Sequence, residues 1–429
     1  MKKKITIIIS VIIVLSLGFY FNPAQEKESS KSNKVKLSSI KSLIEKSIDY
    51  NETPSKKDYP NANAIILKDL GITDETKDQQ VNQALSVIKI FSKKGMENYG
   101  EFKIPYDSEN EKVELITLKT INSDGSIHKP TEKEINDITP ASQSNASIYS
   151  NRKIKTISMP AVEPGSIVIC EYAILTKERT IENEFNHEWY FQSSIPVLES
   201  KLTLKVPKDK KIYYEMLNND ITPNIKKEDD YDKYIWEAKN VSKFVSEPHM
   251  TSPNSFLSKV QITTLSSWDQ VSNWYQDFIK DQYKINEEIE NKIAELTKDK
   301  ASEEDKIEAL YNYVTNNIRY IGMQFGESGY KPYSAIETYN NKYGVCKEKG
   351  TLLIALLKNI DVKAEPVLIN RGNRFINSEF ISPNQFNHLI VYLPKYDLFL
   401  DPTSKNTIFK LLPGDQGKQA LLPESQKMV

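Results

Sequence analysis

The sequence predicts an α+β protein, because its apolar residues follow two different periods in two long parts of the chain. Between residues 59 and 245 they mostly alternate with polar residues, as in half-buried β-strands. From about residue 266 they recur at helical spacing, and short strands follow those helices. We therefore expect a β-sandwich-like domain over residues 59–245 and, over residues 265–415, a domain of helices packed on an antiparallel sheet.

The composition excludes several classes of protein. Hydrophobic residues make up 39% of the chain and charged residues 27%, so it can bury a core and is not a disordered polymer. Lys and Arg total 57 against 58 Asp and Glu, which leaves no basic excess to bind a nucleic acid. Two cysteines and four histidines are too few for a disulfide scaffold or a zinc framework. We expect neither a metal nor a cofactor, and the oligomeric state is not indicated.

The N-terminus predicts a membrane segment over residues 1–21. Three lysines at positions 2–4 precede an uncharged, largely apolar run over residues 5–21, which is typical of a signal peptide or an uncleaved anchor. Residues 22–24, Asn-Pro-Ala, match a cleavage site poorly, so we favour the anchor. The lysines should stay in the cytoplasm. We therefore expect a protein of the cell membrane with the bulk of the chain outside the cytoplasm, or a secreted protein if the segment is cleaved.

Residues 22–58 are expected to form a tether and a short helix. The first part, to about residue 34, is mostly polar and charged, as in a solvated linker. Over residues 35–50, helical spacing relates the apolar residues Leu37, Ile40, Leu43, Ile44 and Ile48.

Three segments of the β-rich part carry the clearest strand patterns. Residues 113–121 alternate and are followed by Asp124-Gly125, which favours a tight turn. Residues 167–175 form a second strand, and residues 201–206 form a third, which stops at Pro207. Cys170 lies in the second strand, where we expect it to be a small buried hydrophobic residue.

The helical part should begin at Ser266 or Ser267 and continue as helix to about residue 296. A second helix should begin at Ser302, with Asp305 as its capping-box partner. The remaining elements are one helix and three strands, expected at residues 346–359, 364–370, 388–393 and 398–400. Residues 416–429 are expected to be a tail.

Three residues of this part are placed where cysteine chemistry needs them. Cys346 begins a helix, whose positive N-terminal end favours a thiolate. His388 opens one strand, and Asp401 follows the next. If these strands pair, Asp401 can reach one imidazole nitrogen while the other faces the sulfur, which would stabilise a thiolate–imidazolium pair.

The segments around these residues resemble a known family. Residues 343–353, 386–391 and 400–403 are similar to the three catalytic blocks of the bacterial transglutaminase-like superfamily. The resemblance implies a papain-like core in which Cys346 is the nucleophile, His388 the base and Asp401 the orienting group. Upstream, further segments resemble a β-rich domain of unknown function that often precedes this core: residues 59–64, 89–95, 104–107, 124–125 and 159–165. Together the two matches cover about residues 59–422.

This chain departs from the family pattern beside the nucleophile. It has Val345 where relatives often have Asp, Glu348 where they often have Asp, and Gly350 where they often have Ala. Loss of a carboxylate at position 345 would ease thiolate formation. Gly350 should cost the helix about 1 kcal/mol relative to Ala.

The oxyanion hole has one natural donor, the backbone N–H of Cys346 at the helix start. The side-chain amide of Gln324, upstream of the nucleophile, is the candidate for the second donor. The alternative interpretation is that Gln324 is an ordinary polar residue of a loop.

The leading hypothesis is an exported, membrane-tethered cysteine enzyme that acts on amide bonds of proteins or wall peptides through a thioester. Hydrolysis is slightly favoured over cross-linking, and the substrate class follows from location alone. The alternative is a catalytically silent scaffold that binds a partner protein or a cell-wall polymer.

Overall fold

We analysed a computed structural model of the chain. It describes residues 40–44, 50–76, 79–139, 152–247, 250, 255–321, 330–372, 376–403, 408–412 and 414–429. No helix among these residues is both long and apolar enough to cross a membrane. The expected membrane segment and the first part of the tether lie outside the described residues.

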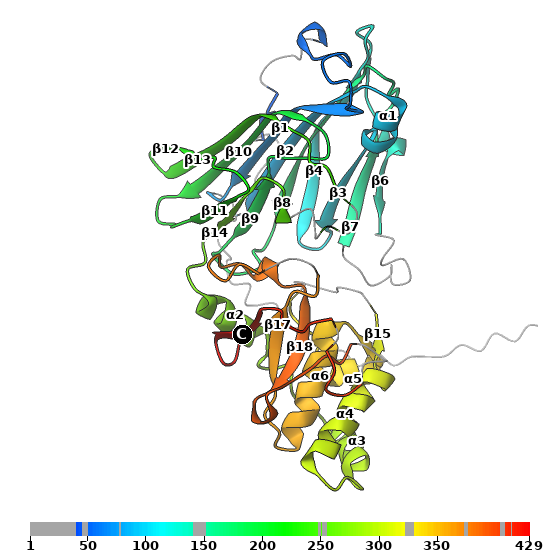
Figure 1. Ribbon diagram of the computed structural model, residues 1–429, viewed down its shortest axis with the longest axis vertical. Coiled ribbons are helices and arrows are strands. Elements are labelled where there is room, and N and C mark those ends of the chain that lie inside the picture. The colour runs from blue at the N-terminus through cyan, green and yellow to red at the C-terminus, as the bar shows by residue number, and fades with distance from the viewer. Residues whose placement is uncertain are drawn as a thin grey trace, which may run out of the picture. The chain divides into compact units, whose positions relative to one another are not determined.

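The β-rich domain is built on an eight-stranded sheet (Figure 1). All neighbouring strands are antiparallel except β1 and β10, which run parallel. The strands, in sheet order, are β12 (Asn224–Lys227), β13 (Tyr231–Val241), β10 (Val197–Pro207), β1 (Ala64–Asp74), β2 (Gln80–Ile90), β8 (Ile167–Thr176), β4 (Glu111–Ile121) and β5 (Ile127–His128). The three strands expected at residues 113–121, 167–175 and 201–206 are confirmed as β4, β8 and β10.

Two three-stranded sheets pack against this sheet and make the domain a sandwich. One consists of β3 (Glu101–Asp107), β7 (Arg152–Ser158) and β6 (Ile135–Ile138), and the other of β11 (Tyr213–Leu217), β14 (Lys259–Thr263) and β9 (Asn186–Tyr190). Ile104 and Ile157 of the first lie in one core cluster with Val168 of the large sheet. Val260 of the second lies in another cluster with Trp236. A short helix, α1 (Lys93–Tyr99), follows β2.

The N-terminal part of the described chain packs on the large sheet. Leu43, Ile44 and Tyr50 contact a core cluster that contains Ile65. The buried Glu171 carboxylate of β8 accepts hydrogen bonds from the Leu43 backbone N–H and the Ser42 hydroxyl, both at 2.6 Å. Residues 40–44 are not helical, and the rest of the helix expected over residues 35–50 lies almost entirely outside the described residues.

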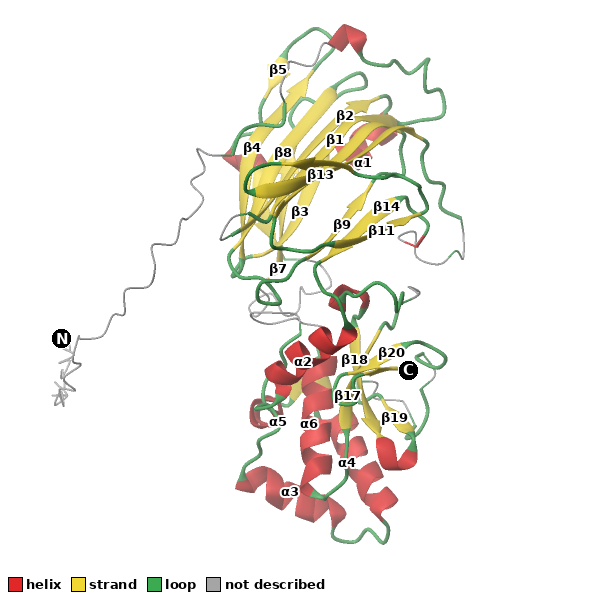
Figure 2. Ribbon diagram, turned by 90° about the vertical axis from the view of Figure 1, so that its left-hand side faces the viewer, coloured by secondary structure: helices red, strands yellow, loops and turns green. Residues whose placement is uncertain are grey.

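The second domain combines helices with a five-stranded sheet, as Figure 2 shows by colour. This confirms the expected α+β organisation of a sheet-rich domain followed by a helix-plus-sheet core. The helices are α2 (Trp268–Ile279), α3 (Glu287–Thr297), α4 (Glu303–Asn317), α5 (Ala335–Asn341) and α6 (Cys346–Asn359). The sheet order is β19 (Leu398–Leu400), β18 (His388–Leu393), β17 (Glu365–Ile369), β20 (Ala420–Leu422) and β21 (Lys427–Met428). A two-stranded pair joins β15 (Arg319–Tyr320) to β16 (Tyr343–Gly344).

The helix starts follow their capping residues. Ser267 caps α2, and Ser302 caps α4 with Asp305 as its capping-box partner, as expected. The helix expected to continue to residue 296 is instead two helices, because Asn286 caps α3 and its side chain accepts from the Ile289 backbone N–H.

Residues 416–429, expected as a tail, belong to the core sheet. Strand β20 pairs with β17, and β21 pairs with β20. Leu421 is fully buried. Strand alternation cannot reveal strands as short as these two. Strand β20 is held by its pairing with β17, and β21 by its pairing with β20.

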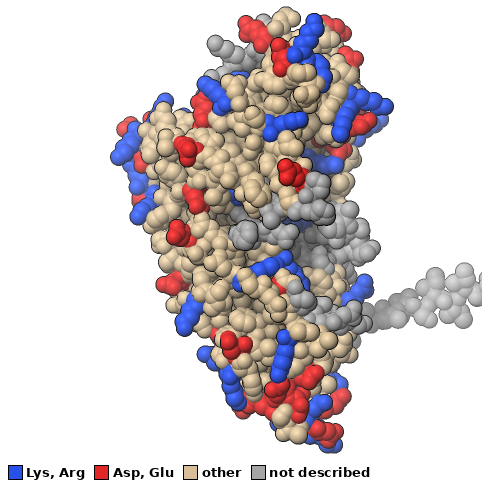
Figure 3. Space-filling view, in the orientation of Figure 1, with Lys and Arg blue, Asp and Glu red and all other residues tan. Residues whose placement is uncertain are grey.

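Charged side chains of both signs cover the domains. On the face drawn in Figure 3, basic and acidic residues are interspersed rather than gathered by sign. This agrees with the formal net charge of −1.

Helix α6 is the central helix of the core. Leu352, Leu353 and Leu356 are fully buried and belong to the same cluster as Leu310 and Val314 of α4. On its other side α6 lies against β18, where a Cβ added to Gly350 would fall well inside van der Waals contact with the Leu389 Cδ2 atom. The glycine therefore allows helix and strand to approach closely, which offsets its low helix propensity.

We predict that Gly350→Ala destabilises the core. The gain in helix propensity of about 1 kcal/mol should be outweighed by overpacking against Leu389, which costs about 1–3 kcal/mol. In a Leu389→Ala background the clash is gone, so the same substitution should become stabilising. Urea unfolding of the single and double variants measures the change in the free energy of unfolding.

The matched control is Gly350→Ala in a Val391→Ala background. That background also shortens a side chain of β18, but it keeps the Leu389 methyl group that clashes with the added Cβ. The Val391 side chain is only in ordinary van der Waals contact with that Cβ. Gly350→Ala should remain destabilising there. Equal effects of Gly350→Ala in all three backgrounds would show that contact with Leu389 is not the reason why a glycine occupies position 350.

Candidate active site

Cys346 is the first residue of α6, as the sequence indicated. Its side chain is partly buried. The N-cap residue is Val345, which has no side-chain acceptor for the N–H groups of the first turn. Its own backbone N–H donates instead to the buried Glu348 carboxylate, at 3.0 Å. The positive end of α6 is therefore directed at the thiol without a capping carboxylate at position 345 to offset it.

A second positive charge lies near the sulfur. Lys347 is 4% exposed, and its ammonium lies 3.8 Å from the Glu348 carboxylate. Burial lowers the pKa of Lys347, while the negative charges of Glu348 and of a Cys346 thiolate oppose that change. A buried ammonium that interacts with the thiolate favours the ionised sulfur.

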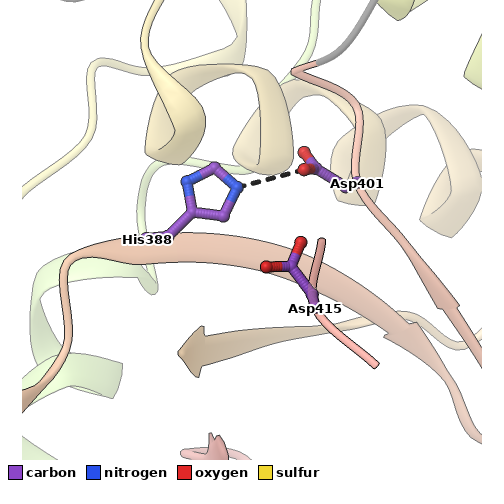
Figure 4. A group of neighbouring side chains, drawn as sticks. All are labelled: His388, Asp401 and Asp415. Atoms are coloured by element: carbon purple, nitrogen blue, oxygen red, sulfur yellow. Dashed lines mark hydrogen bonds and ion pairs between the residues drawn. The ribbon is translucent and has the colours of Figure 1, made fainter. Parts of the chain in front are cut away.

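The sheet brings His388 and Asp401 together. Strands β18 and β19 pair antiparallel, with Val391 opposite Leu400, so the residue after β19 lies beside the start of β18. The His388 Nε2 and Asp401 Oδ2 atoms are 3.2 Å apart, and both side chains are buried (Figure 4). The imidazole is also hydrogen-bonded to the Cys346 side chain, which leaves Nδ1 to face the sulfur. The structure thus brings together the three residues selected from the sequence.

The surroundings of His388 favour its protonated form. Burial opposes protonation, but the hydrogen bonds and negative charges of Asp401 and Cys346 outweigh burial and raise the pKa of His388 to about 9. The Asp401 pKa moves the other way. Burial would raise it, but His388 and Thr403 hold the pKa of Asp401 below its ordinary value. At neutral pH the site therefore holds an imidazolium next to an ionised carboxylate.

Asp401 is held on several sides by groups that the sequence did not single out. Its Oδ1 atom accepts hydrogen bonds from the Thr403 backbone N–H at 2.9 Å and the Thr403 hydroxyl at 2.6 Å. Its backbone oxygen accepts from the Tyr311 hydroxyl of α4 at 3.0 Å. The Arg371 guanidinium lies 2.6 Å from its Oδ2 atom. These contacts fix the carboxylate that orients His388.

Only one of these groups carried a sequence signal. Thr403 belongs to the Leu-Asp-Pro-Thr block that resembled the family. Arg371 lies two residues after β17, and Tyr311 occupies an apolar position of α4. Their role depends on which strands and helices pack together, and residue spacing along the chain does not give that.

The other candidates from the sequence lie elsewhere. Gln324, the candidate oxyanion donor, is outside the described residues. Cys170 is buried in β8, where burial raises the pKa of its thiol to about 12. Both cysteines are free thiols. His187 lies in β9, and burial lowers its pKa to about 4.

A metal ion does not fit the acidic group at this site. Donor atoms of His388, Asp401 and Asp415 lie within 4.8 Å of one another. The Arg371 guanidinium already lies between the carboxylates, 2.6 Å from Asp401 and 3.8 Å from Asp415. A cation would have to displace this guanidinium, so the donor set is that of an ion-pair network.

Two protein families match the chain. A domain of unknown function, DUF3857, matches residues 47–245, which begin somewhat before the boundary expected at residue 59. The transglutaminase-like superfamily matches residues 290–390. This second range contains Cys346 and His388. A search of curated proteins found no match.

One solved structure shares the fold over most of this chain. A putative protease from Parabacteroides distasonis is 17% identical, with a TM-score of 0.72 over 86% of this chain and 71% of that chain. Two others are much less similar. Aminopeptidase A from Legionella pneumophila is 11% identical, with a TM-score of 0.25 over 49% of this chain and 22% of that one. A putative cysteine protease from Cytophaga hutchinsonii is 13% identical, with a TM-score of 0.23 over 51% and 78%. The chain thus joins a DUF3857 domain to a core of the transglutaminase-like superfamily.

Proposed function

We propose that this protein is a cysteine enzyme that cleaves or transfers acyl groups at amide bonds. The observation that carries the proposal is the His388 imidazole, hydrogen-bonded on one side to Cys346 and on the other to the buried Asp401. A sulfur nucleophile, a base and an orienting carboxylate in this order are what thioester chemistry at an amide requires.

Acylation would start from the thiolate–imidazolium pair. The Cys346 sulfur attacks the amide carbonyl carbon, and the backbone N–H of Cys346 at the start of α6 is placed to stabilise the oxyanion. The imidazolium of His388 then gives its proton to the leaving amine as the carbon–nitrogen bond breaks. The products of this step are a thioester on Cys346, a free amine and a neutral imidazole.

Deacylation would use the neutral imidazole as base. His388 removes a proton from water or from an incoming amine, which attacks the thioester carbon. The carbon–sulfur bond breaks, and the thiolate–imidazolium pair is restored. We propose hydrolysis as the preferred outcome, because Cys346 is only partly buried and water can approach its sulfur.

We further propose that the enzyme works outside the cytoplasm while tethered to the membrane. The basic residues 2–4 followed by the uncharged run of residues 5–21 support this location. The amides available there belong to proteins and wall peptides, which makes these the proposed substrates.

We predict that Cys346 reacts with iodoacetamide at neutral pH faster than an ordinary free thiol, because its side chain is hydrogen-bonded to the protonated His388 imidazole. The His388→Ala variant should slow this reaction, since the imidazolium partner is lost. The measurement is the alkylation rate against pH in the full-length protein, with the modified residue identified by mass spectrometry.

Cys170→Ala serves as the control and should leave the profile unchanged, because Cys170 is fully buried in β8. Alkylation of Cys346 at the rate of an ordinary free thiol, both with and without His388, would contradict the proposed enzyme. It would favour the silent scaffold instead.

A second prediction concerns the protonation of His388. Its imidazole should titrate at about pH 9 in the native protein, above the ordinary value of about 6.5. Asp401→Asn should lower that midpoint, because the variant loses the carboxylate charge that stabilises the imidazolium. Deuterium exchange at the imidazole C2 position, followed by mass spectrometry over pH, reports each histidine separately.

His187 is the internal reference for this titration. Its pKa of about 4 places its midpoint far from that of His388, and Asp401→Asn should not move it. A wild-type midpoint for His388 at or below 6.5 would refute the electrostatic account of the site.

A further inference from the structure

Arg371 and Asp415 form a charged pair next to the Asp401 carboxylate, which orients His388. The Arg371 guanidinium uses two nitrogens: NH2 lies 2.6 Å from Asp401 Oδ2, and NH1 donates to the Thr403 hydroxyl at 3.0 Å. Since the Thr403 hydroxyl itself donates to Asp401, Arg371 holds the carboxylate both directly and through Thr403. Such a fork restricts rotation of the Asp401 side chain.

Asp415 is, after Asp401, the second acidic residue close to His388. Its side chain is 1% exposed, and its Oδ2 atom lies 3.8 Å from Arg371 NH2. A carboxylate oxygen of Asp415 lies within 4.8 Å of the donor atoms of both His388 and Asp401. Figure 4 shows its carboxylate beside the hydrogen-bonded pair. Among the described residues its Oδ1 atom accepts no hydrogen bond, and the Lys418 ammonium lies 3.8 Å from it.

The Arg371 contact raises a problem for His388. A guanidinium 2.6 Å from Asp401 offsets much of the negative charge that should stabilise the imidazolium. Asp401 and His388 are buried, so solvent screens their interaction little, whereas the Arg371 side chain is 40% exposed and its charge is partly screened. The negative charge of Asp415 acts in the opposite sense, both on the guanidinium and on the nearby imidazole.

We propose that Arg371 and Asp415 are positioning residues that act through Asp401. Arg371 holds the carboxylate in place, and Asp415 offsets the guanidinium charge so that Asp401 still favours the protonated form of His388. The consequence for catalysis rests on the proposed function. The effect of Arg371 and Asp415 on the protonation of His388 does not depend on the proposed function.

Other ionisable groups also lie around His388 and Asp401. Lys349 of α6 interacts with the Asp401 charge while its ammonium donates to the Ile318 carbonyl oxygen at 2.6 Å. Tyr311 of α4 and Tyr320 of β15 interact with the same charge, and Tyr320 also with Cys346. These groups are unchanged in the variants below, so differences between the variants report on Arg371 and Asp415.

The test is the His388 titration midpoint, measured by C2 deuterium exchange in the full-length protein. Arg371→Met removes a positive charge and also loosens Asp401; we expect the loss of the charge to have the larger effect, so the midpoint should rise. Asp415→Asn removes a negative charge and should lower it, with a shift on the order of one pH unit in each case. A purely structural role would loosen the same hydrogen bond in both variants and shift both midpoints in the same direction.

A double variant makes the test stricter. In Arg371→Met combined with Asp415→Asn the two changes oppose each other, so the midpoint should return toward the wild-type value. Arg371→Lys keeps the charge and should leave the midpoint near wild type. It should still slow Cys346 alkylation at neutral pH, because a lysine cannot hold Asp401 and Thr403 together.

Asp397→Asn is the matched control. It neutralises a carboxylate between β18 and β19 that accepts from the Tyr392 hydroxyl at 2.9 Å, and it should leave the midpoint unchanged. Midpoints that move in the same direction in Arg371→Met and Asp415→Asn, or that do not move, would overturn the proposal. Should Arg371→Met fail to fold, Arg371→Gln replaces it, because it removes the same charge; it should raise the midpoint, and an unchanged or lowered midpoint contradicts the proposal.

These outcomes are independent of the proposed activity. Opposite shifts in the two variants together with an unreactive Cys346 would support the charge relation and refute the enzyme. Rapid alkylation of Cys346 at neutral pH, with no shift of the His388 midpoint in either variant, would support the enzyme and refute the role of this pair.

Discussion

The close packing of α6 on β18 is the contact on which the candidate site depends. Cys346 is the first residue of the helix, and His388 is the first residue of the strand. Helix and strand meet at Gly350 and Leu389, where a Cβ added to residue 350 would clash with the Leu389 Cδ2 atom. Because Leu389 is buried among other side chains, it would have to repack to admit that Cβ.

Electrostatics then decides what the assembled residues can do. Lys347 and the N-terminal end of α6 favour a negative sulfur, and Asp401 favours a positive imidazole. Each of these groups is buried or partly buried, so each charge acts strongly on its neighbours. Arg371 and Asp415 extend the same alternation of sign outward from Asp401. The site is thus a continuous series of opposite charges around the protonated imidazole of His388.

Long, regular elements could be predicted from the sequence, whereas short ones could not. Alternation over residues 113–121 and 201–206 correctly predicted β4 and β10, because one long strand contains several periods. The capping box at Ser302 correctly placed the start of α4. Helix α5 was missed despite a capping box at Ser334 and Glu337, because seven residues give too few turns for a pattern.

By itself the sequence determined the two-part organisation, most of the long elements and the group of Cys346, His388 and Asp401. Helix and strand periods, caps and catalytic blocks are local, so they can be recognised without knowing which segments meet. The tertiary structure alone decided that residues 416–429 join the core sheet, and that Arg371 and Asp415 lie beside Asp401. It also decided that His388 is protonated near neutral pH. Those properties arise from strand pairing and burial between distant segments, which no spacing along the chain encodes.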